Sequence, residues 1–311
     1  MTALYFTPNF IKAPQLTLGM SYLVIVLIVI SSFTSSYWNF RLKESIKKGA
    51  DNVLLYWLSY ISGVIIYAIF FLYLINQSKI SYQGLMLSVL CGLTFAVYAF
   101  SVGKSYELSD LSHAFPLSKI TPLFTLLIGV FVLKETVTLT ALGGIILIIL
   151  GVYGIHLQNF SLKNALQPII SLKHKGSIFA LATALISAVY GLIFKLSIGK
   201  IDQFVFIYLA YLFSTIFYLP FLFYKKKGIL AEFKKYKMQI IQIGILDMFG
   251  AILVLWAVSL SNLSYVFALR QMSILFTVFA GIYIFNEPYG KTRLISSLVI
   301  ILGIIILSAN I

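Results

Sequence analysis

Charged residues are scarce in this chain of 311 residues, which has 23 Lys and Arg but only 9 Asp and Glu. A soluble domain of this size needs a charged outer surface, so the composition excludes an ordinary soluble protein. The single cysteine, Cys91, excludes an internal disulfide and a cysteine-based metal cluster. The sequence has three histidines and no HExxH, Walker or GxSxG motif. These absences argue against an enzyme, and we expect no metal and no cofactor.

Apolar sequence is what the chain has in abundance: 60% of its residues are hydrophobic and its mean hydropathy is +1.00. Runs long enough to cross a bilayer core of about 30 Å recur along it. They predict ten transmembrane helices, at 18–40, 53–75, 83–106, 110–133, 137–157, 177–197, 203–224, 239–259, 262–285 and 292–310. We therefore expect the lipid bilayer and a small molecule as partners, no nucleic acid, and a monomer or homodimer.

The longest polar gap, residues 158–176, works as a linker between two halves of five helices each, 1–157 and 177–311. At an offset of 152 positions, SDLSHAFPLSKITPLFTLLIGVFVLKE (109–135) aligns without a gap on SNLSYVFALRQMSILFTVFAGIYIFNE (261–287). Identical polar and glycine residues coincide, which chance apolar similarity would not readily produce. They include Ser112 with Ser264, Thr125 with Thr277, Gly129 with Gly281, and Glu135 with Glu287.

An odd number of helices in each half requires the second half to enter the membrane from the opposite side. The predicted fold is therefore an all-α integral membrane protein of ten transmembrane helices, built as two five-helix inverted-topology repeats. Many secondary transporters have this architecture and bind substrate near the membrane midplane, between the halves.

The basic residues that produce the net charge of +14 cluster between apolar segments, as in membrane proteins, so nucleic-acid binding is not needed to explain them. The connections after the first, third, fifth, seventh and ninth helices hold 16 Lys and Arg, against 5 in the termini and the other connections. The positive-inside rule then places both termini outside the cytoplasm.

The five-plus-five plan resembles the drug/metabolite transporter superfamily, EamA type, over nearly the whole chain. The resemblance is carried by Pro122 and the apolar run to Glu135, by LGGIILIILGVYG (142–154), by ALRQMSILFTVFAGIYIFNE (268–287) and by Gly303. It implies a multi-pass transporter of small metabolites in the plasma (bacterial inner) membrane, without naming a cargo. It also implies cytoplasmic termini, against the charge count. The second repeat has Ile274 where the first has Pro122, so we expect a proline-dependent bend in the first half only.

Three charged residues fall near the middle of predicted membrane helices: Lys119, Asp247 and Arg270. A charge at mid-bilayer costs about 2.5–3.5 kcal/mol on insertion scales, so each must have a compensating partner or environment. An ion pair between Asp247 and Arg270 on neighbouring helices would be a purely structural arrangement. The repeat equivalent of Asp247 in the first half is Phe95, so Lys119 has no matching carboxylate. Lys119 either extends to the membrane surface or faces a wet cavity that attracts an anion.

The predicted substrate-binding residues are Lys119, Arg270, Gln271, Ser118, Tyr190, Asp247, Ser35 and Trp38. The predicted gating or structural residues are Pro122, His113, Glu135 and Glu287. Structural roles compete with several of these. The hydroxyl-rich SSFTSSYWN (31–39) suits helix packing as well as a cavity wall. His113 suits an interfacial position, and the two glutamates suit conformational anchors. In the superfamily, triose-phosphate translocators hold phosphate with basic residues on their fourth and ninth helices, which is an analogy for Lys119 and Arg270.

Two functions remain open at this stage. The first is a gradient- or exchange-driven transporter of a small anion or zwitterion (an amino acid, a carboxylate or a phosphorylated compound) that works by alternating access, with Lys119 and Arg270 holding the acidic group. The alternative is an exporter of amines or other organic cations, with Asp247 and a cage of aromatic side chains as its site.

Overall fold

The computed structural model describes residues 18–78, 80–108, 118–155, 175–222, 228–276 and 290–309, and in these ranges the regular structure is entirely helical. The helices of the first half are α1 (Leu18–Lys47), α2 (Asn52–Ile75), α3 (Tyr82–Leu108), α5 (Thr121–Leu127), η1 (Ile128–Val132) and α6 (Leu139–Ile155). Those of the second half are α8 (Lys175–Ser197), α9 (Gln203–Phe217), α10 (Leu219–Leu222), α11 (Ile229–Leu260), α12 (Leu263–Leu269) and α14 (Gly290–Ser308).

Six of the described helices are long and apolar enough to cross a membrane. Their outer faces are apolar as well. On α2, the side chains of Ile69 and Tyr73 are 77% and 68% exposed. Contiguous exposed apolar surface of this kind is unfavourable in water and suits contact with lipid. The chain is therefore an integral multi-pass membrane protein.

Most helices follow the predicted spans, but α1 continues to Lys47 instead of ending at 40, the predicted helices 110–133 and 262–285 are interrupted, and α11 begins early. The prediction placed this helix at 239–259, but it begins at Ile229 and carries a kink at Tyr236, where φ is −119° and ψ is 22°. Its first turns contain the exposed lysines Lys234, Lys235 and Lys237. A prediction from hydropathy excludes such charged residues from a membrane span, whereas the helix itself can extend beyond the apolar core of the membrane into water.

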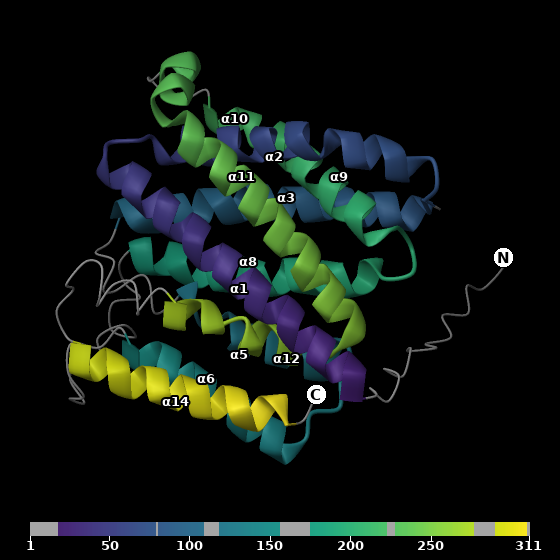
Figure 1. Ribbon diagram of the computed structural model, residues 1–311, viewed down its shortest axis with the longest axis vertical. Coiled ribbons are helices and arrows are strands. Elements are labelled where there is room, and N and C mark those ends of the chain that lie inside the picture. The colour runs from purple at the N-terminus through teal and green to yellow at the C-terminus, as the bar shows by residue number, and fades with distance from the viewer. Residues whose placement is uncertain are drawn as a thin grey trace.

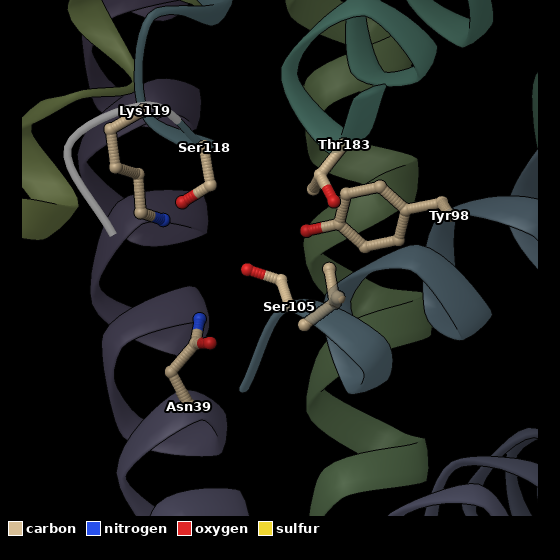
Figure 2. Close-up of a pocket in the computed structure, with 7 residues that line it drawn as sticks. Asn39, Tyr98, Ser105, Ser118, Lys119 and Thr183 are labelled. Carbon is tan, nitrogen blue, oxygen red and sulfur yellow. The ribbon is translucent and has the colours of Figure 1, made fainter. Parts of the chain in front are cut away.

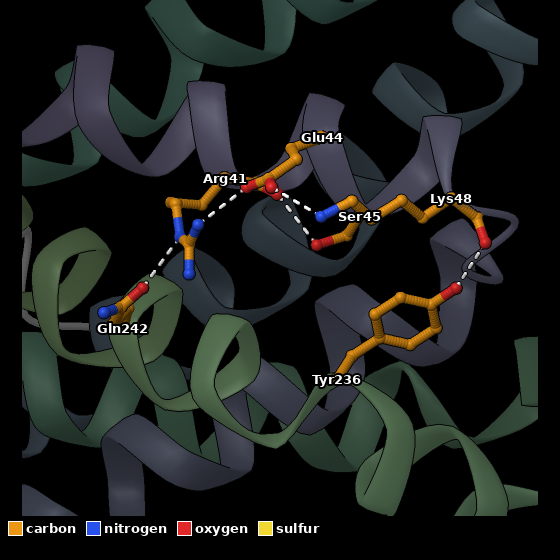
Figure 3. A network of polar contacts seen from close by, with 6 residues as sticks. All are labelled: Arg41, Glu44, Ser45, Lys48, Tyr236 and Gln242. Carbon is orange, nitrogen blue, oxygen red and sulfur yellow. Dashed lines mark hydrogen bonds and ion pairs between the residues drawn. The ribbon is translucent and has the colours of Figure 1, made fainter.

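A polar network holds the start of α11 to the end of α1 (Figure 3). The Tyr236 hydroxyl donates to the carbonyl oxygen of Lys48 at 2.7 Å, and Arg41 Nε donates to Gln242 Oε1 at 2.8 Å. Glu44 accepts from both Arg41 and Lys48, at 2.6 and 2.7 Å. The network fixes the crossing of α1 and α11 at one end of the molecule.

The main packing contacts join elements of the two halves. α1 packs on α11, α3 on α8 and on α9, α2 on α11 and on α9, and α6 on α14. Figure 1 shows the α6–α14 pair at one end of the long axis and α2 with α9 at the other. The crossings are close because glycines remove the side chain. A Cβ on Gly144 would lie 2.9 Å from the Gly303 carbonyl oxygen, whereas a Cβ on Gly143 would have no atom within 4 Å.

Candidate substrate cavity

The helix that carries Lys119 is interrupted at that residue. Ser118 is helical, Lys119 lies in a turn, and α5 begins only at Thr121. Pro122, which is buried, occupies the first turn of α5, where its missing N–H costs nothing. Lys119 is therefore at a break in the backbone, not within a continuous membrane helix as the sequence suggested.

The helix that carries Arg270 breaks at the equivalent place, so the absence of a proline-dependent bend in the second half does not mean that this helix is continuous. α12 ends at Leu269, Arg270 and Gln271 form a turn, and helical structure resumes at Met272. The turn is closed by short-range bonds, from Ser273 N to Arg270 O at 3.1 Å and from Ile274 N to Gln271 O at 2.9 Å. Ile274 thus takes part in a break that needs no proline.

Hydroxyl groups of α1 explain how the second break is stabilised without proline. Ser32 Oγ donates to the Arg270 carbonyl oxygen at 3.3 Å, and Ser36 Oγ donates to the Ser273 carbonyl oxygen at 2.6 Å. Carbonyl groups released from a helix inside a membrane must find donors in the protein. The repeat equivalents on α8 are Ala184 and Ala188, which have no hydroxyl to donate. The two halves therefore stabilise the same break by different means.

Two small cavities lie beside these breaks, and Tyr98 lines both. The polar cavity, of about 20 Å³, is lined by Asn39, Tyr98, Val102, Ser105, Ser118, Lys119 and Thr183. The aromatic cavity, of about 40 Å³, is lined by Trp38, Tyr60, Phe95, Tyr98, Tyr190, Phe194, Tyr211, Asp247, Ala251, Val254 and Arg270. Spaces of these sizes hold one or a few water molecules.

The polar cavity brings together donors from four elements (Figure 2). Lys119 and Ser118 come from the first helix break, Asn39 from α1, Ser105 from α3, and Thr183 from α8. Figure 2 shows the Lys119 ammonium group directed toward the space between these side chains. The Lys119 ammonium is the main donor of this set, because the Thr183 hydroxyl already donates to the Phe179 carbonyl oxygen at 2.8 Å and Asn39 Nδ2 donates to the Ser35 carbonyl oxygen at 2.7 Å. A cation among hydroxyl and amide groups suits an oxyanion.

The aromatic cavity holds Asp247 and Arg270, but they do not form the predicted ion pair. Both residues are described, and no contact of 4.0 Å or less joins their charged groups. Arg270 Nη1 donates instead to the Tyr190 hydroxyl at 3.0 Å. The Tyr211 hydroxyl is placed to donate to the Asp247 carboxylate. Each of the two charges thus has a tyrosine hydroxyl as its polar neighbour.

The two cations lie near enough to repel each other, although they line different cavities. The Arg270 guanidinium also lies 5.9 Å from the ring centre of Phe267. Lys119, Arg270 and Asp247 are the charged residues that line the two cavities in the part of the chain the structure describes. The lining therefore carries one more positive than negative charge when all three are ionised.

The other predicted substrate-binding residues divide into two groups. Trp38, Tyr190 and Ser118 line the cavities, together with the three charged residues. Ser35 and Gln271 are buried but line neither cavity. Gln271 Nε2 donates to the Phe267 carbonyl oxygen of its own helix at 3.4 Å, which indicates a structural contact.

Of the predicted gating and structural residues, Glu135 has the clearest placement. Its carboxylate accepts from Leu263 N at 2.6 Å, and from Ser264 N at 3.3 Å and Ser264 Oγ at 2.8 Å, so it caps the first turn of α12. Lys195 donates to the carbonyl oxygens of Val258 and Ser261, at 2.9 and 2.7 Å, at the end of α11. The turn between α11 and α12 is therefore held on both sides. His113 and Glu287 lie outside the described residues.

Sequence reasoning missed most of the uncharged lining. Asn39, Tyr98, Ser105, Thr183, Tyr60, Phe95, Phe194, Tyr211, Ala251 and Val254 all line a cavity and were not predicted as site residues. Tyr98 and Ser105 are seven positions apart, which places them on one face of α3. That spacing was a usable signal, but a serine on a membrane helix serves helix packing as readily as substrate binding.

Interrupted membrane helices around a buried polar site are a feature of membrane transporters. The chain belongs to the EamA-like transporter family, whose model matches residues 22–157 and again 174–309. It is therefore a membrane transporter of small molecules, in which the family unit occurs twice. The chain is similar to one solved protein, described as a crystal structure of a protein, over 94% of this chain and 97% of that chain, with a TM-score of 0.68 and 12% sequence identity. At this identity the similarity shows a shared fold alone. Among curated proteins, none matches.

Proposed function

We propose that the chain is a secondary transporter that moves a small anionic or zwitterionic metabolite by alternating access. The observation that carries the proposal is the placement of Lys119 and Arg270. Each stands at a helix break, one in each half, and each lines one of two adjoining cavities. Two cations with hydroxyl and amide donors around them match a carboxylate or a phosphate.

Packing supports the finer architecture, ten membrane helices as two inverted repeats. If the halves are exchanged, the α1–α11 contact becomes α8–α3, and α3–α9 becomes α11–α2, and all four contacts occur. The repeat-related glycines agree: a Cβ on Gly92 would meet α9 at Ala210, and one on Gly244 would meet α2 at Ser59. This exchange is what a two-fold axis between the halves produces, and five helices per half make the relation an inversion.

The size of the cavities supports alternating access. Spaces of about 20 and 40 Å³ are far below the 300 Å³ or so that a small-molecule site requires. A metabolite can occupy the site only after the surrounding helices separate. Rocking of one half against the other would open the site toward one side of the membrane at a time. A gradient or exchange of substrates would drive the transport.

One observation favours the alternative, an exporter of amines or other organic cations. Asp247 is free of an ion pair to Arg270, and it shares a cavity with Trp38, Tyr60 and Tyr211. A carboxylate within a ring of aromatic faces is a favourable site for an ammonium group. The nearby Arg270 opposes a cation, and for this reason we rank the anion first.

A thermal-stability screen on the detergent-purified protein separates the two functions. The probes are inorganic phosphate, L-lactate and L-glutamate against choline and tetraethylammonium, with uptake of any hit then measured in proteoliposomes. A ligand that binds only the native state raises the melting temperature by mass action. We expect the acidic probes to do so. Stabilisation by the two cations alone would overturn the anion proposal in favour of the cation exporter.

A further inference from the structure

We propose that Asp247 is a proton-binding site that couples the transporter to a proton gradient, so that one proton enters the site with each anion. The inference rests on the proposed function and adds the coupling ion to it. In this scheme the carboxylate takes a proton from the water on the side where the anion enters. It releases that proton to the water on the other side, after the anion has left.

The position of Asp247 is the first argument. Of the carboxylates that the structure describes, Asp247 alone lines either cavity. It sits on α11, between Trp38 of α1 and the aromatic residues of α2 and α9. Asp51, Asp202 and Glu135 cap helices by accepting backbone N–H groups, and Glu44 pairs with basic side chains. Those four carboxylates therefore have structural roles, as acceptors of hydrogen bonds or as partners in ion pairs. Asp247 caps no helix and forms no ion pair within the described chain, and its polar neighbour is the Tyr211 hydroxyl.

The neighbours of Asp247 suit both of its protonation states. The titratable groups that face it are Tyr60 on α2, Tyr211 on α9, Tyr190 on α8, Tyr98 on α3 and Arg270 after α12. α1 contributes Trp38, which does not titrate. A tyrosine hydroxyl can donate to a carboxylate and can also accept from a carboxylic acid. A direct arginine pair would have favoured the ionised form only.

Charge balance supplies the coupling. In the empty site, the positive charge of Arg270 favours the Asp247 carboxylate, and Lys119 lies near enough to Arg270 for the two cations to repel each other. An anion bound to the two cations cancels this stabilisation and adds its own repulsion, so protonation of Asp247 becomes less costly. By linkage, a proton on Asp247 strengthens anion binding by the same factor. Coupling between two sites is typically about 5–150-fold. Anion and proton together leave the net charge of the site unchanged.

Calorimetry on the detergent-purified full chain tests the inference. L-Lactate and L-glutamate, whose carboxylates stay ionised over the pH range used, are titrated in buffers of different ionisation enthalpy, which gives the number of protons taken up per anion bound. Phosphate, which itself changes charge near neutral pH, is tested for binding only. The titration is repeated from mildly acidic to mildly alkaline pH. The variants are Asp247→Asn and, as a matched control, Asp202→Asn, which makes the same change at an exposed helix cap where asparagine serves equally well.

The wild type and Asp202→Asn are expected to take up close to one proton per anion, and their affinity should rise as pH falls, by up to about tenfold per pH unit. Asp247→Asn should take up none, and its affinity should not change with pH. Anion binding without proton uptake at any pH, or equal uptake by Asp247→Asn, would overturn the proton site and leave the anion transporter standing. No binding of any of the three probes would overturn both proposals.

Discussion

At the scale of single residues, Lys119 shows how a helix break lowers the cost of a buried charge. A lysine in a continuous membrane helix faces lipid or other helices, whereas a lysine in a turn lies beside backbone groups that have lost their helical partners. Here the ammonium also shares the lining of one cavity with the polar side chains of Ser118, Asn39 and Ser105. The break and the charge thus support each other, and together they make up the site that we propose for an anion.

Lys119→Gln should keep the fold and weaken transport of an anionic cargo. The change removes the charge but keeps a hydrogen-bonding group. Loss of a hydrogen bond to a charged group costs about 1.5–3 kcal/mol, so uptake at low substrate concentration should fall about 10- to 100-fold. Proteoliposome uptake and the melting temperature are the measurements. Lys119→Arg should be partly active at best, because a flat guanidinium differs in shape from an ammonium.

The control for this experiment is Lys48→Gln. Lys48 forms an ion pair with Glu44 and its side chain is 58% exposed, so its loss should change little. Full transport by Lys119→Gln would show that the lysine has no role in binding. A collapse of its stability would make the lysine a structural residue. Either result would return the cation exporter to first place.

Arg270→Gln should reduce stability more than Lys119→Gln does, because it leaves Asp247 without the cation of its own cavity. We expect a loss of about 1–3 kcal/mol, the usual cost of a buried polar group that loses a partner. Adding Asp247→Asn should recover part of the loss, since the remaining charge is then removed as well. Melting temperatures of the two single variants and the double variant measure this coupling. Simple addition of the two single effects would contradict it.

The charged residues of the site could be predicted from the sequence, whereas the uncharged residues that line it could not. Lys119, Asp247 and Arg270 were found because an ionised group in an apolar segment is costly unless the fold compensates it. Their arrangement was not predictable, since the distance between Asp247 and Arg270 depends on which rotamer and which helix face each adopts. Phe194 and Val254 line the same cavity, but they look like any other apolar residue of a membrane helix.

At the scale of elements, the two helix breaks should respond to different substitutions. Ser32→Ala with Ser36→Ala removes both hydroxyls that reach the carbonyl groups of the second break. We expect a loss of about 1 kcal/mol per hydrogen bond, together with a change in transport rate as the break rearranges. Melting temperature and uptake measure the two effects.

Ser31→Ala is the matched control for that double variant. The Ser31 hydroxyl is also buried on α1, but it bonds to Ile28 O of its own helix. Its removal should cost less and leave transport unaltered. An equal effect at Ser31 would show that the hydroxyls of α1 stabilise α1 itself, and that the break in the second half does not depend on them.

The sequence predicted a bend at Pro122 in the first half and gave no sign of the break in the second half, for a physical reason. A proline can be recognised in the sequence, and because it lacks a backbone N–H it predicts a bend in a helix. The second break depends on donors from α1, more than 200 positions away in the chain. The serine-rich stretch 31–39 indicated helix packing as one of its roles, but nothing in the sequence said which carbonyl groups its hydroxyls would meet.

At the scale of the whole molecule, the two strongest basic runs lie at one end. Residues 41–48 and 234–237 are brought together where the Tyr236 hydroxyl bonds to the Lys48 carbonyl oxygen. If this end faces the cytoplasm, as the positive-inside rule requires, both chain termini lie on the opposite side. The EamA resemblance implies the reverse orientation, so a direct measurement is needed.

Reporter fusions at Ile311 provide that measurement. We expect a reporter that is active only outside the cytoplasm to work, and one that is active only inside to fail. A fusion after Lys48, in the short loop between α1 and α2, serves as the control and should give the opposite result. Cytoplasmic activity at Ile311 would show that family topology outweighs the charge count.

The arrangement of helices was largely predictable because the sequence repeats itself. The offset of 152 positions identified the halves and their equivalent residues, such as Gly92 and Gly244, before any contact was known. What the repeat could not supply was the difference between the halves. Ala184 stands where Ser32 does, and Ile274 where Pro122 does, so each half depends on different contacts for the same backbone shape.

The closed aromatic cavity has a consequence for the time course of binding. A space of about 40 Å³ is too small for a metabolite, so a transporter that binds its cargo here, as we propose, must open before the ligand can enter. At low concentration the observed rate of association should rise with ligand, as for any encounter. At high concentration it should level off at the rate of opening, because further ligand cannot hasten a step in which it takes no part. The plateau in a rapid-mixing experiment would then be the same for every cargo that the site accepts.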